Sequence, residues 1–258
     1  MKTPLQRVYW DQISDDYQQL TTITTDDFHF GPLLPGNREL KLLPEITPGT
    51  TCLELGCGGA QNSIHLASQG ADCTAIDISS EQIKHAKALS AEHGVNIDLR
   101  CMTLENLSAW PEGQYDFVHS VYALPFIAEP ETFIKNAAAC VAPGGTFLLV
   151  TQHPVFSAEW LELEDEEMGL FMPSYFEPPE DIRQTSDGEI IGSSAYPIST
   201  ISEWIHTAGL RDLRLWEPKP LPIESVDQAP YYSPAWIEIH DKLSVSPVAI
   251  IYSATAPL

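Results

Sequence analysis

Short apolar runs alternate with amphipathic segments between residues 51 and 153, and this alternation limits the possible folds most strongly. Five runs have the length and composition of buried strands: TCLELG, DCTAIDI, NIDLRC, YDFVHSVYAL and GTFLLVTQH. Three segments with helical spacing lie among them: AQNSIHLASQG, SSEQIKHAKALSAEHG and PETFIKNAAACVAPGG. This order predicts an α/β fold in which a mostly parallel sheet has helices on both faces. The loops after the strands then carry the binding site.

The flanking regions are less regular. Residues 1–45 are predicted to form an N-terminal helical cap, because residues 6–20 carry apolar side chains at helical spacing. Residues 152–198 lack a clear period, and we interpret them as an insertion after the fifth strand that covers the substrate. One helix and two strands follow and complete a seven-stranded sheet: STISEWIHTAGL, RDLRLWEP and SPVAIIYSAT. Because no internal repeat or clean linker is visible, residues 1–258 are predicted to be a single domain.

Composition excludes several classes of partner. The chain has 13 Lys and Arg against 36 Asp and Glu, a formal net charge of −23, which disfavours nucleic acid and anionic membranes. The five cysteines form no CxxC pair and are interpreted as small buried residues in a reducing compartment. No apolar run is long enough to span a membrane and no signal sequence is visible, so we expect a cytoplasmic protein. A homodimer is among the assemblies that the sequence allows.

A glycine-rich turn lies between the first strand and the first helix of the alternating region. Gly56 and Gly58 allow a tight turn and a close approach of the backbone to a ligand, and the helix that follows presents free N–H groups. A dinucleotide fold expects a third glycine where Gln61 stands. Glu54 would repel a pyrophosphate but attract the amino group and sulfonium of S-adenosylmethionine (SAM). Asp77 closes the second strand and can accept hydrogen bonds from a ribose, which NAD and SAM both carry.

Three stretches resemble the class I SAM-dependent methyltransferases: LELGCGGAQNSIHLASQGADCTAIDISSEQIKHA, LENLSAWPEGQYDFVHSVYAL and VAPGGTFLL. SEWIHTAGLRDLRLWEP is similar to the late helix and strand of that family. The resemblance implies a Rossmann-like sheet in which SPVAIIYSAT is an antiparallel strand between the fifth and sixth strands. The stretch between RLWEP and this strand, which contains Tyr231, Tyr232 and Trp236, is expected to be a long surface excursion.

The resemblance also implies a role for individual residues. Backbone at Gly56 and Gly58, with Glu54 nearby, would receive the methionyl part of SAM, and Asp77 would bind the ribose hydroxyls. The other implied contacts are Ile78 and Gln82 beside the adenine, Thr103 and Leu104 at its edge, Ser120 facing the methionyl group, and Tyr17 or His29 at the cofactor carboxylate. Two positions depart from the family pattern, because Ala60 replaces a glycine and Thr103 replaces an acid.

Methyl transfer from a sulfonium needs mainly a positioned nucleophile, and an oxygen nucleophile gains from a general base. His153, directly after the fifth strand, is the first candidate for this base, and Tyr122, after the fourth strand, is the second. His119 lies within a strand and is interpreted as a core residue. No cluster of His, Asp or Glu has the spacing of metal ligands, so no metal is expected.

The insertion is rich in aromatic and acidic residues. Its aromatic residues suggest an apolar pocket for a small organic molecule: Phe156, Trp160, Phe171, Tyr175 and Phe176. Its acids raise the hypothesis of a cationic or amine-bearing substrate. The sequence therefore favours an enzyme that transfers a methyl group from SAM to an oxygen or nitrogen of a small metabolite. The alternatives are a non-catalytic SAM-binding regulatory protein or another SAM-fold transferase, with an NAD oxidoreductase disfavoured by Gln61 and Glu54.

Overall fold

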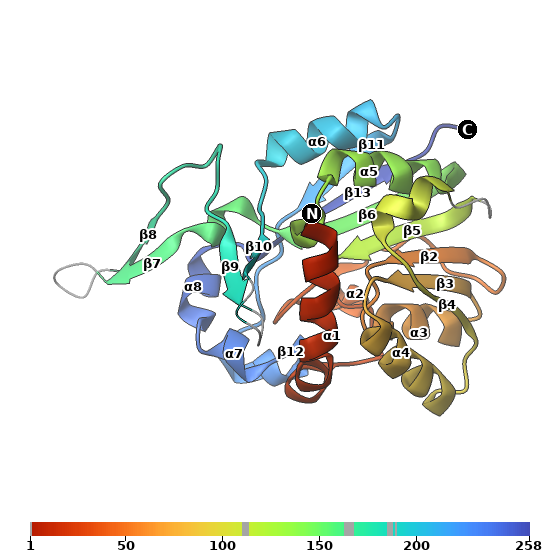
Figure 1. Cartoon of the computed structure of the whole chain (residues 1–258), viewed down its shortest axis with the longest axis horizontal. Coiled ribbons are helices and arrows are strands. Elements are labelled where there is room, and N and C mark those ends of the chain that lie inside the picture. Colours follow the sequence, from red (N-terminus) through yellow and green to blue (C-terminus); the bar gives the residue numbers. More distant parts are fainter. Residues whose placement is uncertain (1, 110–113, 163–167, 185–187, 189) are drawn as a thin grey trace.

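The computed structural model describes residues 2–109, 114–162, 168–184, 188 and 190–258. A seven-stranded sheet with the order β11-β13-β6-β5-β2-β3-β4 forms its centre (Figure 1). Five strands are parallel: β2 (Thr51–Leu55), β3 (Asp72–Asp77), β4 (Ile97–Cys101), β5 (Tyr115–Val121) and β6 (Val141–Gln152). β13 (Ala249–Thr255) is antiparallel to both β6 and β11 (Arg211–Trp216). The predicted α/β sheet, including its antiparallel strand, is confirmed.

Helices cover both faces of the sheet. α3 (Gln61–Ser68) and α4 (Ser80–Glu92) bury their apolar side chains in one hydrophobic cluster, which also holds Phe28 and Phe117. α5 (Pro130–Ala139) and α6 (Ile198–Thr207) pack into a second cluster on the opposite face (Figure 1). The helix predicted over residues 130–145 ends earlier, at Ala139, because the chain enters β6 at Val141.

The N-terminal helix α1 (Lys2–Leu20) confirms the predicted cap. It packs beside α4 and stands across the ends of the central parallel strands (Figure 1). Shorter elements complete the fold: β1 (Thr22–Ile23), α2 (Asn37–Leu40), η1 (Leu104–Ala109), η2 (Leu124–Phe126), η3 (Pro154–Ser157), η5 (Ile223–Gln228), β12 (Tyr231–Tyr232), α7 (Pro234–Ile237) and α8 (His240–Val245). Within the described ranges, no helix is both long and apolar enough to cross a membrane.

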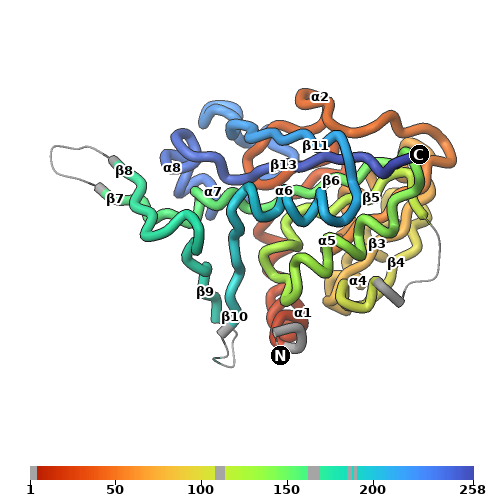
Figure 2. Tube along the Cα trace, turned by 90° about the horizontal axis from the view of Figure 1, so that it is seen from above, coloured from red at the N-terminus to blue at the C-terminus, as the bar shows by residue number. Residues whose placement is uncertain are grey.

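The insertion after β6 contains two antiparallel hairpins, although its sequence shows no clear period. β7 (Glu159–Glu162) pairs with β8 (Met168–Phe171), and β9 (Asp181–Gln184) pairs with β10 (Ile190–Ser193). The β7–β8 hairpin projects from the body of the protein, whereas β10 packs against α1 and η2 (Figure 2). Phe171 and Phe176 are 52% and 82% exposed, so the prediction that they line an apolar pocket is wrong. Several acids of the insertion, in 163–167 and at 187 and 189, lie outside the described residues.

The stretch between β11 and β13 is not the surface excursion that the sequence suggested. β12 pairs antiparallel with β1, and Tyr231 is only 8% exposed. Leu33 also donates a backbone hydrogen bond to the Tyr231 carbonyl at 2.8 Å. This late segment therefore packs against the N-terminal segment and closes the molecule over the strand ends.

Candidate active site

The glycine-rich turn joins β2 to α3 in a left-handed backbone path. Gly56 and Gly58 have φ angles of 78° and 53°. A Cβ at Gly56 would lie 2.4 Å from the Ala123 Cβ, so only glycine fits this position without a shift. Ala60 immediately precedes α3 and also adopts a left-handed conformation, with φ 58° and ψ 29°. An alanine adopts this left-handed conformation at a free-energy cost that a glycine would avoid, so either residue can occupy the position.

Asp77 ties the end of β3 to this turn. Its Oδ2 accepts a hydrogen bond from the Gly58 N–H at 2.8 Å, and its Oδ1 accepts one from the Ser79 N–H at 2.8 Å. Burial raises the pKa of the Asp77 carboxyl, and these two hydrogen bonds oppose that shift. Ser79 caps α4, so Asp77 is not needed for that purpose. A carboxylate has about four lone-pair positions, so Asp77 can still accept a hydrogen bond from a ligand.

Glu54 is buried on β2 beside the first turn of α3. Both the N–H and the hydroxyl of Ser63 donate hydrogen bonds to Glu54 Oε2. Burial raises the pKa of Glu54 to about 7, although the Ser63 hydrogen bonds act in the opposite direction. A cationic group close to this carboxyl would favour its ionised form at neutral pH.

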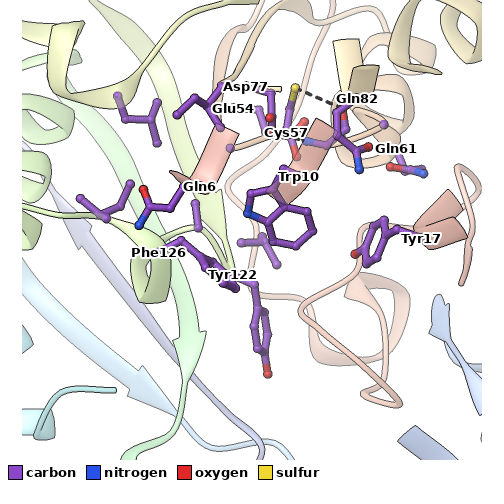
Figure 3. Close-up of a pocket in the computed structure, with 18 of the residues that line it drawn as sticks. Gln6, Trp10, Tyr17, Glu54, Cys57, Gln61, Asp77, Gln82, Tyr122 and Phe126 are labelled. Carbon is purple, nitrogen blue, oxygen red and sulfur yellow. Dashed lines mark hydrogen bonds between the residues drawn. The ribbon is translucent and has the colours of Figure 1, made fainter. Parts of the chain in front are cut away.

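A first cavity of about 140 Å³ lies between the glycine-rich turn and α1. Figure 3 shows Glu54 and Asp77 on one side of this cavity and Tyr17 and Tyr122 on another, with Trp10 between them. Gln18 of α1 reaches across the turn, because its Nε2 donates to Gln82 Oε1 at 2.8 Å and its Oε1 accepts from Gln61 Nε2 at 3.0 Å. The N-terminal helix α1 is thereby hydrogen-bonded to both α3 and α4.

Most of the predicted site residues meet in this first cavity, while three lie outside its lining. The residues that line it are Tyr17, His29, Glu54, Gly56, Gly58, Asp77, Ile78, Gln82, Leu104 and Tyr122. Thr103 precedes the lining residue Leu104 but is not part of the cavity wall. Ser120 is fully buried and donates to the Leu55 carbonyl at 2.8 Å.

His153, the first candidate for the general base, also lies outside the cavity lining. Its Nε2 is 2.9 Å from Glu217 Oε1, and its Nδ1 accepts a hydrogen bond from the Val155 N–H at 3.1 Å. Burial lowers the pKa of His153, opposed by Glu217. Both ring nitrogens are therefore occupied by neighbouring residues. His119 is a core residue as expected, fully buried and stacked on Phe117 with ring centroids 4.9 Å apart, but neither of its ring nitrogens has a hydrogen-bond partner among the described residues.

A second cavity of about 930 Å³ adjoins the first. Its walls come from α1, from η3 and β9 in and around the insertion, and from the late segment that contains Tyr231 and Trp236. Some residues line both cavities: Trp10, Tyr17, His29, Val121, Tyr122 and Phe126. Sequence reasoning missed the contribution of the late segment, although its cluster of aromatic residues was visible. Among the described residues, no group of His, Cys, Asp or Glu side chains is placed to hold a metal ion.

Residues 53–149 match a family model described as a methyltransferase domain. This match identifies residues 53–149 as a methyltransferase domain. Its matched region includes the glycine-rich turn, Glu54 and Asp77. The ubiquinone biosynthesis O-methyltransferase of Xanthomonas campestris pv. campestris is 38% identical over 104 residues, 40% of this chain and 44% of that protein. The enzyme of the same name from Chromobacterium violaceum is 34% identical over 120 residues, 42% of this chain and 52% of that protein. The chain thus spans about half the length of these curated relatives.

Solved structures resemble the methyltransferase domain and its flanking segments together. A Listeria monocytogenes protein assigned to the SAM-dependent methyltransferases is 25% identical, with a TM-score of 0.64 over 85% of this chain and 95% of that chain. A Mesorhizobium loti SAM-dependent methyltransferase is 19% identical, with a TM-score of 0.64 over 84% and 94% of the two chains. The cyclase SpnF is 16% identical, with a TM-score of 0.64 over 100% and 97%. The last two likenesses concern the fold alone.

Proposed function

We propose that this chain binds SAM in the first cavity and transfers its methyl group to an oxygen or nitrogen of a small molecule in the second. The observation that carries this proposal is the shared wall of the two cavities. A methyl donor on one side and an acceptor on the other would meet at that wall, as an in-line displacement requires. The curated relatives named O-methyltransferases support an oxygen acceptor.

The residues of the first cavity fit SAM. The turn at Gly56 and Gly58 admits a ligand close to the backbone, and the Asp77 carboxylate can accept a further hydrogen bond from a ribose hydroxyl. Within the described chain, Gln82 Nε2 is buried without a hydrogen-bond partner, so it can donate to a ring nitrogen of adenine. Glu54 would face the positively charged methionyl end. When bound, SAM supplies a methyl group already activated on a sulfonium.

Other predicted contacts have weaker support. Ile78 and Leu104 offer apolar surface for the adenine, and Tyr17 or His29 would reach the methionyl carboxylate. Thr103 and Ser120 would act through the backbone that they hold rather than by direct contact, because neither lines the first cavity. Tyr122 remains a candidate to contact the reacting atoms because it lines both cavities, whereas His153 lines neither.

The second cavity suggests the nature of the acceptor. Phe156 and Trp236 pack against each other on its wall, with ring centroids 5.7 Å apart, so an apolar or aromatic small molecule fits best. The acids near the opening include Glu159 and Asp181, but the cations Arg183 and Lys242 also line this cavity. An amine-bearing acceptor therefore stays a hypothesis. The acidic composition supports a partner set without nucleic acid, and we extend the proposal to a single-domain cytoplasmic protein.

Two alternatives remain: a non-catalytic SAM-binding regulatory protein and another SAM-fold transferase. A protein described as a cyclase shares this fold, so the fold alone does not determine the reaction. A second cavity of about 930 Å³ beside the first favours an enzyme over a simple SAM-binding module.

Mass spectrometry of ligand that co-purifies with the protein tests the cofactor. We expect SAM or S-adenosylhomocysteine, and co-purified NAD would overturn the assignment. Incubation with methyl-labelled SAM and a metabolite extract tests the reaction. Transfer of label to a small molecule supports the enzyme, whereas tight SAM binding with no labelled product supports the regulatory alternative.

A further inference from the structure

Among the residues that the structure describes, the wall between the two cavities contains a single histidine, His29. Among the residues that the described chain places on both cavities, Trp10, Val121 and Phe126 have no basic lone pair. The tyrosines are poor bases at neutral pH because burial raises the pKa of Tyr17 and of Tyr122 well above the usual range. His29 is therefore the side chain at this wall that can take up a proton.

The fold holds His29 from both sides. The fully buried side chain of Asn62, in the first turn of α3, clamps the His29 backbone. Its Oδ1 accepts from the His29 N–H at 2.9 Å, and its Nδ2 donates to the His29 carbonyl at 3.2 Å. The imidazole ring lies edge-on to Tyr231, with centroids 5.4 Å apart. Tyr231 is itself hydrogen-bonded to Tyr17, with hydroxyl oxygens 3.0 Å apart.

The imidazole also has an unfilled hydrogen-bonding position. His29 Nδ1 is buried, and no described residue is its hydrogen-bond partner. Because buried polar atoms nearly always have a hydrogen-bond partner, an unpaired one indicates a position that a water or ligand atom completes. Because Nδ1 has almost no exposed surface, the placement of the imidazole beside a bound acceptor rests on the ring lining both cavities.

We propose that His29 is the general base of the reaction, an inference that rests on the proposed methyl transfer. As the acceptor oxygen attacks the methyl carbon, its O–H proton passes to the His29 imidazole and the S–CH₃ electron pair stays on sulfur. The products are a methyl ether, S-adenosylhomocysteine and an imidazolium, which later releases its proton to solvent through the second cavity. The site carries one positive charge before and after the step, first on sulfur and then on the ring. The step adds no net charge to the buried site, so it carries no additional desolvation cost.

The surroundings keep His29 neutral before the reaction. Burial lowers the pKa of His29 to about 3, so its lone pair is free throughout the neutral range. The titratable groups around it are His119 on β5, Tyr231 on β12, Tyr17 on α1 and Tyr122 after β5. In the same range the pKa of His119 is lowered to about 3, and burial keeps the tyrosines protonated. The acid limb of the pH profile of kcat, measured at saturating SAM so that Glu54 is ionised, should consequently show no inflection near the usual histidine pKa of about 6.5.

The test compares two acceptors of similar shape and different acidity, phenol and pentafluorophenol, with methyl-labelled SAM. Pentafluorophenol is ionised near neutral pH and needs no base, whereas phenol is not. We expect His29→Gln to lower kcat for phenol by about 10²–10⁴-fold and to lower it much less for pentafluorophenol, with S-adenosylhomocysteine affinity unchanged. Imidazole added to His29→Ala should restore part of the phenol activity. His206→Gln, on the exposed surface of α6, is the matched control and should retain full activity.

The outcomes separate the two proposals. If the wild type methylates neither phenol nor any compound of the extract, the methyl-transfer proposal fails and the role of His29 fails with it. If the wild type is active but His29→Gln loses the same factor with both phenols, or loses nothing, the general-base role alone is overturned. Loss of S-adenosylhomocysteine binding in both His29 variants would also overturn it, because the residue would then serve the cofactor pocket.

Discussion

Replacing Asp77 with Asn tests the cofactor pocket, because the two side chains have nearly the same shape. The Asp77 carboxylate accepts from two backbone N–H groups, those of Gly58 and Ser79, each at 2.8 Å. An amide keeps one acceptor oxygen and presents an NH₂ group to the other N–H. The Asn variant therefore leaves one buried donor unpaired, which costs about 1–3 kcal/mol of folding free energy. For a chain of this size, each kcal/mol lowers Tm by about 2–4 °C.

The same substitution should weaken cofactor binding. A hydrogen bond to a charged acceptor contributes about 1.5–3 kcal/mol, and Asp77→Asn converts the acceptors for the ribose hydroxyls into one neutral oxygen and one donor. We expect S-adenosylhomocysteine affinity, measured by isothermal titration calorimetry, to fall about 10- to 100-fold. Asp72→Asn, at the exposed start of the same strand, is the control and should bind like the wild type. Affinity of Asp77→Asn within about threefold of the wild type would refute the assignment of Asp77 to the ribose.

Three further substitutions probe the turn and its cover. Because burial raises the pKa of Glu54 to about 7, the folded apoprotein holds a proton that the unfolded chain has already released, so the free energy of unfolding should fall as pH rises toward 7. SAM affinity should rise over the same range and then level off, and Glu54→Gln should abolish both slopes in calorimetry and urea unfolding. Ala60→Gly relieves about 1–2 kcal/mol of left-handed strain, but it removes a buried methyl group and increases the entropy of the unfolded chain. The free energy of unfolding, measured with urea, should therefore change by less than about 1 kcal/mol. A loss above about 2 kcal/mol would contradict this balance. Gln18→Ala removes the bonds from α1 to Gln61 and Gln82 and should speed S-adenosylhomocysteine release severalfold in stopped-flow measurements, and an unchanged rate would show that α1 does not retain the ligand.

The grouping of residues around the first cavity, which we assign to the cofactor, could be predicted from the sequence because its determinants are local. Glu54, the two glycines and Asp77 lie within one strand–turn–helix–strand unit. The boundaries of this unit are visible in the sequence, because Gly70 ends the helix, Ser79 caps the next helix and the spacing of apolar residues changes between strand and helix. Within such a unit, parallel pairing of β2 and β3 brings the ends of both strands to the same edge. Spacing along the chain therefore fixes proximity in space.

The errors have a different physical origin. His153 follows β6 as predicted, but its ring turns toward Glu217 rather than toward the cavity, and nothing in the local sequence specifies that rotamer. Phe171 and Phe176 are apolar, yet the hairpin that carries β8 projects away from the body, so composition alone did not predict burial. Tyr231 was expected on the surface, because its pairing partner Ile23 lies at the opposite end of the chain and no local pattern reveals that contact.

The two cavities therefore differ in how sequence encodes them. The first is built mainly from the region matched by the family model, residues 53–149, where short loops impose geometry locally. Much of the second is assembled from α1, the insertion and the late segment around Trp236, which meet only after the chain has folded. Substitutions outside the matched region can thus reshape the acceptor cavity without disturbing the glycine-rich turn. His29 lies outside that region, and the Asn62 side chain within it holds the His29 backbone, so His29 links the wall outside the matched region to the wall inside it. This position allows one base to keep its alignment with the methyl donor while the acceptor cavity diverges around it.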